Sequence, residues 1–187
     1  MYETADIRKN LKIEIDGNPY VVIDFQFVKP GKGNAFTRTR LKNMITGAVL
    51  DRTYKTGEKL VPAHLEEHDM QYLYQEGDRY HFMNNETYEQ VELNEEQLGD
   101  AKNWLIENLS VKILYFKELP IGVTPPNFVE MEVVESDPGL KGDTATGATK
   151  PAKLVTGAQI MVPLFVNQGD WIQIDTRTSE YLRRVAK

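Results

Sequence analysis

The chain has 187 residues, 41% of them hydrophobic, and 22 basic side chains against 28 acidic ones, which gives a net charge of −6. This length allows one domain or several small ones, and the lack of cysteine excludes disulfides, thiolate metal sites and cysteine nucleophiles. The longest apolar stretch, residues 160–166, contains Pro163 and is shorter than the roughly 18 residues of a membrane span, so we expect a cytoplasmic protein without a membrane anchor.

Residues 11–28 predict two β-strands. Apolar and polar side chains alternate over Leu11–Ile15, residues 16–19 (Asp-Gly-Asn-Pro) break the chain, and Tyr20–Val28 forms the next strand. The same pattern recurs, with turns between the segments, over Phe36–Leu41, Met70–Tyr74, Arg79–Met83, Val111–Phe116, Phe128–Val134, Ile160–Val166 and Trp171–Asp175. Short strands separated by turns are typical of small β-barrels, so we expect an all-β protein.

One segment, Asn94–Leu105, departs from the period of two. Asn94 is a suitable helix N-cap, and Glu95 and Glu96 place negative charge in the first turn of a short helix. We expect this helix to close one end of a barrel.

Charge is distributed unevenly along the chain. Residues 1–64 carry a net charge of +4, residues 65–126 carry −9, and residues 127–187 carry −1. Proline-containing segments, Leu60–Ala63 and Gly122–Pro126, separate the three blocks. We therefore expect three domains with these bounds. Pieces of about 60 residues are only marginally stable alone, so we expect the first two to pack on each other.

The basic block contains a stretch without carboxylates. The 26 residues from Phe25 to Leu50 hold no Asp or Glu, and five cations fall among them: Lys29, Lys32, Arg38, Arg40 and Lys42. Such a stretch suits a face that binds a polyanion. On charge alone, a solvated strand face fits equally well, because a firm duplex binder makes roughly 6–10 phosphate contacts.

Lys32 lies between Gly31 and Gly33, after Pro30, in the turn between two predicted strands. Glycine permits a tight or positive-φ backbone, so we expect Lys32 at the exposed tip of a hairpin, roughly 20 Å from the far ends of its strands. A glycine-rich turn that happens to contain lysine is the simpler interpretation. The neighbouring cations, however, could hold phosphate groups on either side of the tip.

The segment Lys29–Phe36, with its continuation to Asn43, closely resembles the modification hairpin of the bacterial elongation factor P family, relatives of the hypusine-containing factor of eukaryotes and archaea. Other segments resemble that family in the same order along the chain: Gly122–Glu130, Asp137–Thr144, Val162–Val166, Asp175–Thr178, and Glu180 with Tyr181. The resemblance covers essentially the whole chain.

The resemblance implies three β-barrel domains in an L shape that mimics a tRNA, an SH3-like or KOW-like first domain followed by two OB-fold domains. It also implies a translation elongation factor that binds the 50S and 30S subunits between the P and E sites and relieves stalling at consecutive prolines. Such a factor would act by ordering the P-site peptidyl-tRNA for peptidyl transfer. We therefore expect a monomer that is not an enzyme and uses no cofactor or metal.

The resemblance also assigns site residues. Lys32 takes the position of the post-translationally modified residue, and lysine there favours β-lysylation or an aminopentanol extension, made by separate lysine-modifying enzymes, over rhamnosylation. The residues expected to contact tRNA or rRNA are Lys29, Gly31, Lys32, Gly33, Arg38, Arg40 and Lys42. The residues expected on the side of the mRNA E-site codon and the small subunit are Gly142, Asp143, Thr144, Arg177, Tyr181, Arg183 and Arg184.

Two other functions fit parts of the sequence. Residues 64–68 match the His-x-x-Glu-His pattern of zinc hydrolases, but they follow Pro62 at a domain boundary and show no helical period, so we expect no metal site. A generic single-strand RNA-binding OB-fold protein is the other alternative, because aromatic side chains of the middle block could stack on bases. The charge of −9 favours core positions for these aromatics instead: Tyr72, Tyr74, Tyr80, Phe82, Tyr115 and Phe116. His81 is expected at a surface or barrel position of a strand.

Overall fold

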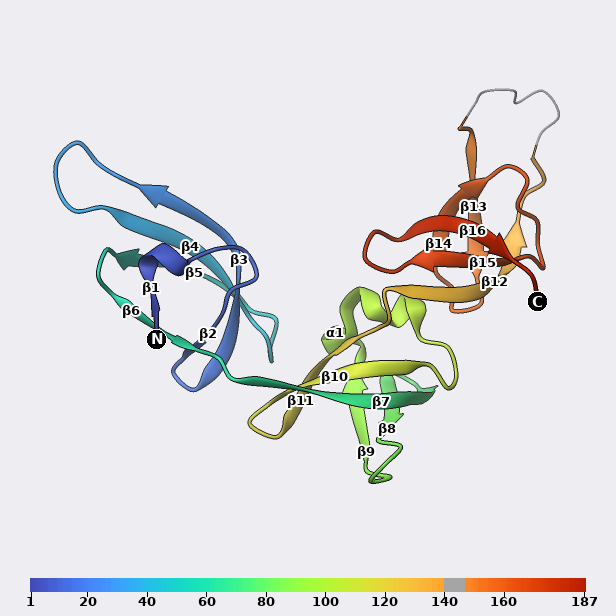
Figure 1. Cartoon of the computed structure of the whole chain (residues 1–187), viewed down its shortest axis with the longest axis horizontal. Helices are drawn as coiled ribbons and strands as arrows, with labels where there is room; N and C mark the ends of the chain where they lie inside the picture. The colour runs from blue at the N-terminus through green and yellow to red at the C-terminus, as the bar shows by residue number, and fades with distance from the viewer. Residues whose placement is uncertain (140–146) are drawn as a thin grey trace. The chain divides into compact units, whose positions relative to one another are not determined.

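The computed structural model describes residues 1–139 and 147–187. Its elements form three β-sheets, as Figure 1 shows. The chain divides into two compact units, Met1–His68 with Ile113–Gly122, and Asp69–Lys112 with Val123–Lys187. Among the described residues, every helix is too short or too polar to span a bilayer.

The first sheet has six antiparallel strands in the order β1-β6-β2-β3-β4-β5. Their bounds are Tyr2–Glu3 (β1), Lys12–Ile15 (β2), Asn18–Val28 (β3), Phe36–Asn43 (β4), Val49–Lys55 (β5) and Lys59–Pro62 (β6), with the 3-10 helix η1 at Thr4–Asp6 after β1. One face of the sheet covers a small core of Ile7, Leu11, Ile13, Val22, Leu41, Tyr54 and Leu60. Strand β2 pairs only with the first residues of β3, up to Val21, whereas β3 and β4 remain paired up to Val28 and Phe36. The end of the β3–β4 hairpin therefore extends beyond this core.

The second sheet has the order β11-β10-β7-β8-β9. Its strands are Leu65–Glu76 (β7), Arg79–Met83 (β8), Gln90–Asn94 (β9), Ser110–Phe116 (β10) and Leu119–Thr124 (β11). Lys117, in the turn between β10 and β11, donates a hydrogen bond to Glu14 of β2 at 2.9 Å. This ion pair lies within the first unit and ties the β10–β11 turn to the first sheet.

The aromatic side chains of the middle block are mostly in the core, as predicted. Tyr72, Tyr80, Phe82 and Phe116 are each at most 7% exposed. The prediction is wrong for Tyr74, which is 51% exposed. A register shift between Tyr72 and Tyr74 in the β7–β8 ladder interrupts the alternation, and Tyr74 stacks on the ring of His81 at 4.5 Å between centroids.

The predicted helical segment forms the short helix α1 (Glu95–Leu98) followed by the 3-10 helix η2 (Gly99–Trp104). The N-cap is confirmed: the Asn94 side chain accepts a hydrogen bond from the backbone of Gln97 at 2.8 Å, and the Gln97 side chain accepts one from the backbone of Asn94 at 2.9 Å. Gly99 has a φ of +55°, a conformation that ends the α-helix. This break turns the second half of the segment toward the third sheet.

The third sheet has the order β14-β13-β12-β15-β16, and all four pairs of neighbouring strands are antiparallel. Its strands are Phe128–Ser136 (β12), Thr149–Leu154 (β13), Gln159–Pro163 (β14), Trp171–Asp175 (β15) and Glu180–Val185 (β16). Its core contains Met131, Leu154, Val162 and Ile172, none of them exposed, and Trp104 of η2 packs into the same cluster. The segment that was expected to close one end of a barrel therefore contributes Trp104 to the core of the third sheet.

All nine predicted strands are present, and one ends earlier than expected. Strand β14 stops at Pro163, whereas the sequence pattern predicted a strand up to Val166. Proline has no N–H group for a ladder, and the backbone of Val166 turns back to donate to the carbonyl of Pro163 at 3.1 Å. The strands that the alternation did not predict are β1, β5, β6, β9, β11, β13 and β16.

Candidate nucleic-acid interface

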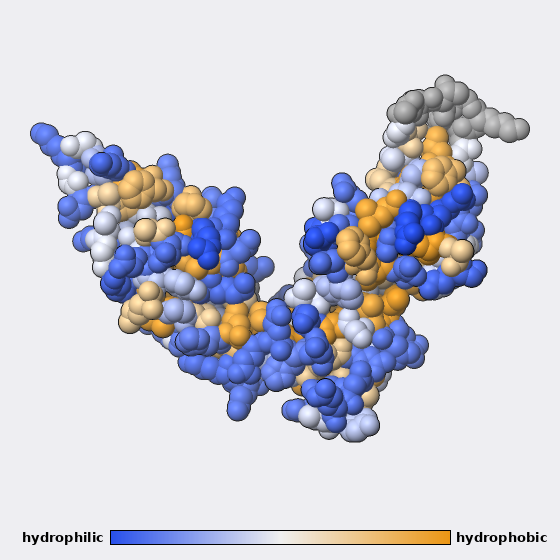
Figure 2. Space-filling model, viewed as in Figure 1, coloured by the Kyte–Doolittle hydropathy of each residue, from blue (hydrophilic) through white to orange (hydrophobic). Residues whose placement is uncertain are grey.

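Lys32 lies at the tip of the β3–β4 hairpin. The last paired residues are Val28 and Phe36, and residues 29–35 form the connecting loop beyond the ladder, visible at the left of Figure 1. Residues 31–34 are all exposed, and this end of the molecule is mostly hydrophilic in Figure 2. No hydrogen bond or ion pair within the described residues engages Lys29 or Lys32. The expected location of Lys32 is confirmed, and its role stays a prediction.

The two glycines beside Lys32 differ in conformation. Gly33 has a φ of +99°, which non-glycine residues rarely adopt, whereas Gly31 is outside the positive-φ region. A Cβ atom added at either position would meet no atom within 4 Å. Gly33 is therefore required by backbone conformation, and the turn leaves open space around its tip.

Three of the predicted RNA-binding cations share one face of β4. Arg38, Arg40 and Lys42 are exposed and alternate with the buried Thr37, Thr39, Leu41 and Asn43. The period of two of a β-strand directs alternate side chains to the same side of the sheet. We call this exposed set, Arg38, Arg40 and Lys42, the cationic face.

Arg40 is already paired with carboxylates. It lies opposite Asp24 of β3 and Asp51 of β5, and its Nε donates to Oδ1 of Asp51 at 3.1 Å. The hydrogen bond and charge of Asp51 raise the pKa of Arg40 further above its ordinary value. In the sequence, Asp24 and Asp51 lie immediately before and after the stretch without carboxylates. Antiparallel pairing nevertheless places both beside Arg40, in the middle of that stretch.

Arg38 has a different environment. Its guanidinium carbon lies 5.4 Å from the centroid of the Phe36 ring, two residues away on the same face. An aromatic ring beneath the guanidinium orients it but does not neutralise its positive charge, as a carboxylate would. Within the described part of the chain, neither Arg38 nor Lys42 forms an ion pair, so these two cations, like the loop lysines, are available to phosphate.

Lys55 of β5, which was not among the predicted RNA-binding residues, lies opposite Phe36 and extends the cationic face. Strand β5 was not predicted because its side chains do not alternate clearly: six of its seven residues are exposed. Lys55 lies beyond Asp51, which ends the stretch without carboxylates, so it was not counted among the cations of that stretch. Only the pairing of β4 with β5 places Lys55 opposite Phe36, on the same face as Arg38.

The C-terminal candidates lie in the second unit. Arg177 follows β15, and its Nε and Nη2 donate to the two carboxylate oxygens of Asp175 at 3.1 and 2.9 Å. The side-chain hydrogen bond from Arg177 holds the pKa of Asp175 below its usual value, with backbone hydrogen bonds adding to the effect and burial opposing it. Arg177 also lies over the Phe128 ring at 5.3 Å. Its guanidinium is thus held in a fixed orientation.

The other C-terminal candidates do not form one patch. In the β15–β16 ladder Arg183 lies opposite Gln173 and Arg184 opposite Ile172, so the two arginines point to opposite sides of the sheet. Arg183 donates to Gln173 at 3.0 Å, while Arg184 lies 3.7 Å from Asp170 and 4.8 Å above the Phe165 ring. Tyr181 packs against the core of the third sheet. Gly142, Asp143 and Thr144 lie outside the described residues.

The His-x-x-Glu-His segment has no helix. Residues 65–76 form strand β7, and four residues of strand span about 13 Å, so His64 and His68 are not brought together as they would be on one helical turn. The ring of His68 lies 4.5 Å from that of Tyr115, and its Nε2 lies 3.3 Å from a carboxylate oxygen of Glu66. The geometry that zinc hydrolases require is therefore missing from this segment.

Three family models match the chain one after another. They are the elongation factor P (EF-P) KOW-like domain over residues 3–60, the elongation factor P (EF-P) OB domain over residues 65–123, and the elongation factor P C-terminal domain over residues 129–184. KOW-like and OB domains agree with the three sheets, so the predicted all-β fold class is confirmed.

Individual proteins show the same relationship. "Elongation factor P 2" of Geobacter sulfurreducens is 56% identical over 185 residues, covering 99% of each chain. "Elongation factor P" of Caldicellulosiruptor bescii is 55% identical over 185 residues, covering 99% of this chain and 100% of its own. Both names denote translation factors.

A solved structure supports the fold. "Eukaryotic translation initiation factor 5A from Methanococcus jannaschii" aligns with a TM-score of 0.53 at 22% identity, over 66% of this chain and 91% of that one. With matching family models along its length and relatives of more than half identity from end to end, the chain belongs to the elongation factor P family of translation elongation factors.

Proposed function

We propose that the chain binds the ribosome between the P and E sites and relieves stalling at consecutive prolines by ordering the P-site peptidyl-tRNA. Membership of the family makes it a translation elongation factor that interacts with the ribosome. The finer proposal is carried by one observation: Lys32 lies exposed and unpaired within the described structure, at the end of a hairpin that projects past its core.

The hairpin suits a reach toward a reaction centre. Its ladder runs from Tyr20 opposite Asn43 to Val28 opposite Phe36, a length of about 26 Å at strand spacing. Pairing of β4 with β5 along the same length supports the arm on a second side. A supported arm with a cation at its end can place that charge against the CCA end of a tRNA.

In the proposed mechanism the factor orients the peptidyl-tRNA and takes no chemical part in peptide-bond formation. Proline is a poor nucleophile in a constrained ring, and holding the peptidyl-tRNA in attack geometry lowers the entropic part of the barrier. The Lys32 ammonium would contribute charge and contact, with no proton transfer to or from the substrate. The bond-forming chemistry would remain that of the ribosome.

The remaining site residues are proposed in supporting roles. Phosphate groups of tRNA or rRNA would meet Lys29, Arg38 and Lys42, while Gly31 and Gly33 let the backbone of the tip approach them closely. The small subunit and the mRNA E-site codon would be faced by Arg177, Tyr181, Arg183 and Arg184. Because Arg183 and Arg184 point to opposite sides of the sheet, these two would contact different partners. The domain bounds 1–64, 65–126 and 127–187 are supported by the ranges of the three family models.

A lysine-modifying enzyme is a further proposed partner. Modification would lengthen the Lys32 side chain and so extend the reach of the arm. The peptide spanning Lys32, taken from protein of the native cells and cut by a protease that does not cleave at lysine, should show a mass increment that identifies the group. An unmodified lysine would restrict the mechanism to the shape of the hairpin and the shorter ammonium.

Substitution of Lys32 tests the proposed mechanism. In a reconstituted translation reaction on a Pro-Pro-Pro template, Lys32→Ala should abolish rescue, because the tip group is lost, and should change ribosome affinity by less than about threefold, because one cation contributes little. Lys12→Ala, which removes an exposed cation of β2 in the same unit, should retain both properties. Rescue by Lys32→Ala at the wild-type rate would contradict the proposal.

A generic single-strand RNA binder is the second candidate, favoured by the arrangement of Arg38 over Phe36. That function predicts that Lys32→Ala weakens RNA binding no more than the loss of any other cation, with a salt slope reduced by about one. The two candidates therefore differ in whether Lys32 has an effect that RNA affinity does not explain.

A further inference from the structure

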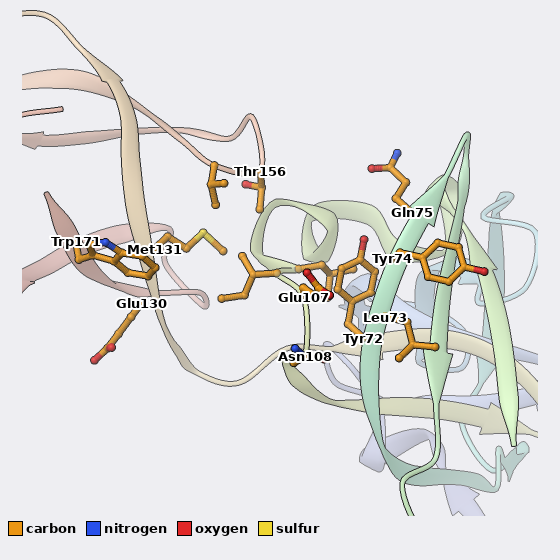
Figure 3. A pocket seen from close by; sticks show the side chains of 13 residues that line it. Tyr72, Leu73, Tyr74, Gln75, Glu107, Asn108, Glu130, Met131, Thr156 and Trp171 are labelled. Carbon is orange, nitrogen blue, oxygen red and sulfur yellow. The ribbon is translucent and has the colours of Figure 1, made fainter. Parts of the chain in front are cut away.

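The second unit contains a cleft that the proposed ribosomal contacts do not use. It is lined by residues 72–75 of β7, residues 105–108 after η2, Glu130 and Met131 of β12, residues 155–156 after β13, and Trp171 of β15. Figure 3 shows Trp171, Met131 and Glu130 on one side and Tyr72 and Glu107 on the other. All of these residues belong to the same compact unit.

The cleft is apolar with acidic groups at its wall. Ile106, Val155 and Trp171 contribute aliphatic and aromatic surface, with Val155 54% exposed, and the carboxylates that line the cleft belong to Glu107 and Glu130. None of its described lining residues is Lys, Arg or His. A nucleic acid would therefore bring phosphate toward two carboxylates with no cation among the lining residues, whereas a positively charged ligand is complementary.

The ammonium group of Lys187 already contacts two of the residues that line the cleft, Glu130 and Trp171. Lys187, which does not line the cleft, places its Nζ 3.1 Å from Oε2 of Glu130 and 5.0 Å from the centroid of the Trp171 ring. A carboxylate and an indole face together offer an ammonium a charged hydrogen bond and a cation–π contact. The Lys187 side chain is 48% exposed, so this contact is weak and open to exchange.

We propose that the cleft binds a basic segment of a protein partner, with a lysine ammonium at Glu130 and Trp171 in place of Lys187. Apolar side chains next to that lysine pack against Ile106 and Val155, which also line the cleft. Glu107 offers a second acceptor for a further cation. The partner class is thus a lysine-containing peptide with apolar flanks, and the site is separate from the hairpin tip and the cationic face.

This arrangement makes Lys187 an intramolecular competitor. A peptide that binds must first displace its ammonium, so the apparent affinity is reduced by the fraction of molecules in which Lys187 occupies the site. Removing Lys187 should strengthen peptide binding. A purely structural role of the Lys187–Glu130 pair predicts no such gain.

Nuclear magnetic resonance of the full chain tests the proposal, because the two tryptophans give separate indole N–H signals and Trp104 is buried as an internal reference. The probe is the N-acetylated, C-amidated peptide Leu-Lys-Leu-Lys, and its control is the same peptide with both lysines acetylated. The Trp171 signal, assigned through Trp171→Phe, should shift saturably with the first peptide and not with the second.

The variants give directional outcomes. Glu130→Gln should weaken binding about threefold, Lys187→Ala should tighten it by about twofold or more, and Glu135→Gln, on the same strand but outside the cleft, should leave it unchanged. Equal shifts from the acetylated peptide, tighter binding of single-stranded oligouridine at Trp171, or unchanged or weaker peptide binding by Lys187→Ala would each overturn the proposal. Because the readout needs no ribosome, failure here is distinct from failure of the Lys32 mechanism.

Discussion

Arg38 and Arg40 point to the same side of β4 but have different neighbours. Asp51 holds Arg40 through a hydrogen bond of 3.1 Å, while Arg38 lies over the Phe36 ring. A phosphate that binds Arg40 must compete with a carboxylate, whereas one that binds Arg38 does not. Two arginines that look equivalent in the sequence should therefore differ in their contribution to RNA binding.

Substitution of each arginine separates these contributions. Arg38→Gln should weaken binding to a labelled single-stranded oligonucleotide by about threefold and reduce the salt slope by about one, while Arg40→Gln should change affinity by less than about twofold. Fluorescence anisotropy at several salt concentrations measures both quantities. Equal losses for the two variants would show that the pair with Asp51 does not limit Arg40.

Gly31 and Gly33 form a matched pair at the tip. Gly33→Ala should destabilise the folded protein by about 1–2 kcal/mol, because an alanine at a φ of +99° is strained although space for its Cβ exists. Gly31→Ala should be close to neutral, since its φ is not positive. Chemical denaturation of the two variants provides the comparison. Equal stability of the two would mean that the turn adopts another conformation in solution.

At the scale of elements, the β15–β16 turn is built around a carboxylate. Asp175 accepts hydrogen bonds from the backbone and side chain of Arg177, and the backbone of Ser179 donates to the carbonyl of Asp175 at 2.8 Å. Phe128 of β12 lies under the same guanidinium. These contacts connect the turn to the centre of the third sheet, so protonation of Asp175 should loosen it.

The pH dependence of this turn follows from the lowered pKa of Asp175. A group with a depressed folded-state pKa adds stability above its unfolded pKa, about 3.9, and loses that contribution as pH falls through the folded value. Arg177→Gln should therefore destabilise the protein at pH 6, and its difference from wild type should shrink as pH falls below about 4. Denaturation at pH 6, 4 and 3 measures this. A difference that is independent of pH would exclude the ion pair as its cause.

At the scale of the whole molecule, Trp104 connects elements that are distant in the sequence. It ends η2, which follows the second sheet's β9, yet it is buried in the core of the third sheet at 3% exposure. Thr156, after β13, donates to the carbonyl of Asn103 at 2.7 Å beside it. The third sheet therefore lacks part of its core without residues from the middle of the chain.

Truncation of Trp104 should show this dependence. Trp104→Ala should destabilise the third sheet by about 3–5 kcal/mol, as for other large buried side chains, and Leu182→Ala, at an exposed site of β16, by less than about 1 kcal/mol. Trp171 remains as the fluorescence reporter of the third sheet during unfolding. Equal effects of the two substitutions would mean that η2 does not contribute to that core.

Much of the local structure follows from the sequence, because its causes are local. Alternation of apolar side chains predicted nine strands, and Asn94 with its acidic neighbours predicted a capped helix start. The same reasoning missed β5 and β16, since edge strands with both faces largely exposed carry little hydrophobic alternation. It extended β14 past Pro163, where the absence of an N–H group ended the ladder.

By itself, the sequence determined the class of the fold, the position of Lys32 at a hairpin tip, and the family resemblance, because strand period, turn chemistry and motif order are properties of neighbouring residues. Only the tertiary structure decided which charges meet. It paired Arg40 with Asp51, sent Arg183 and Arg184 to opposite sides of a sheet, and brought Lys187 to Glu130 and Trp171. Strand register and the packing between elements set these contacts, and both depend on the whole chain.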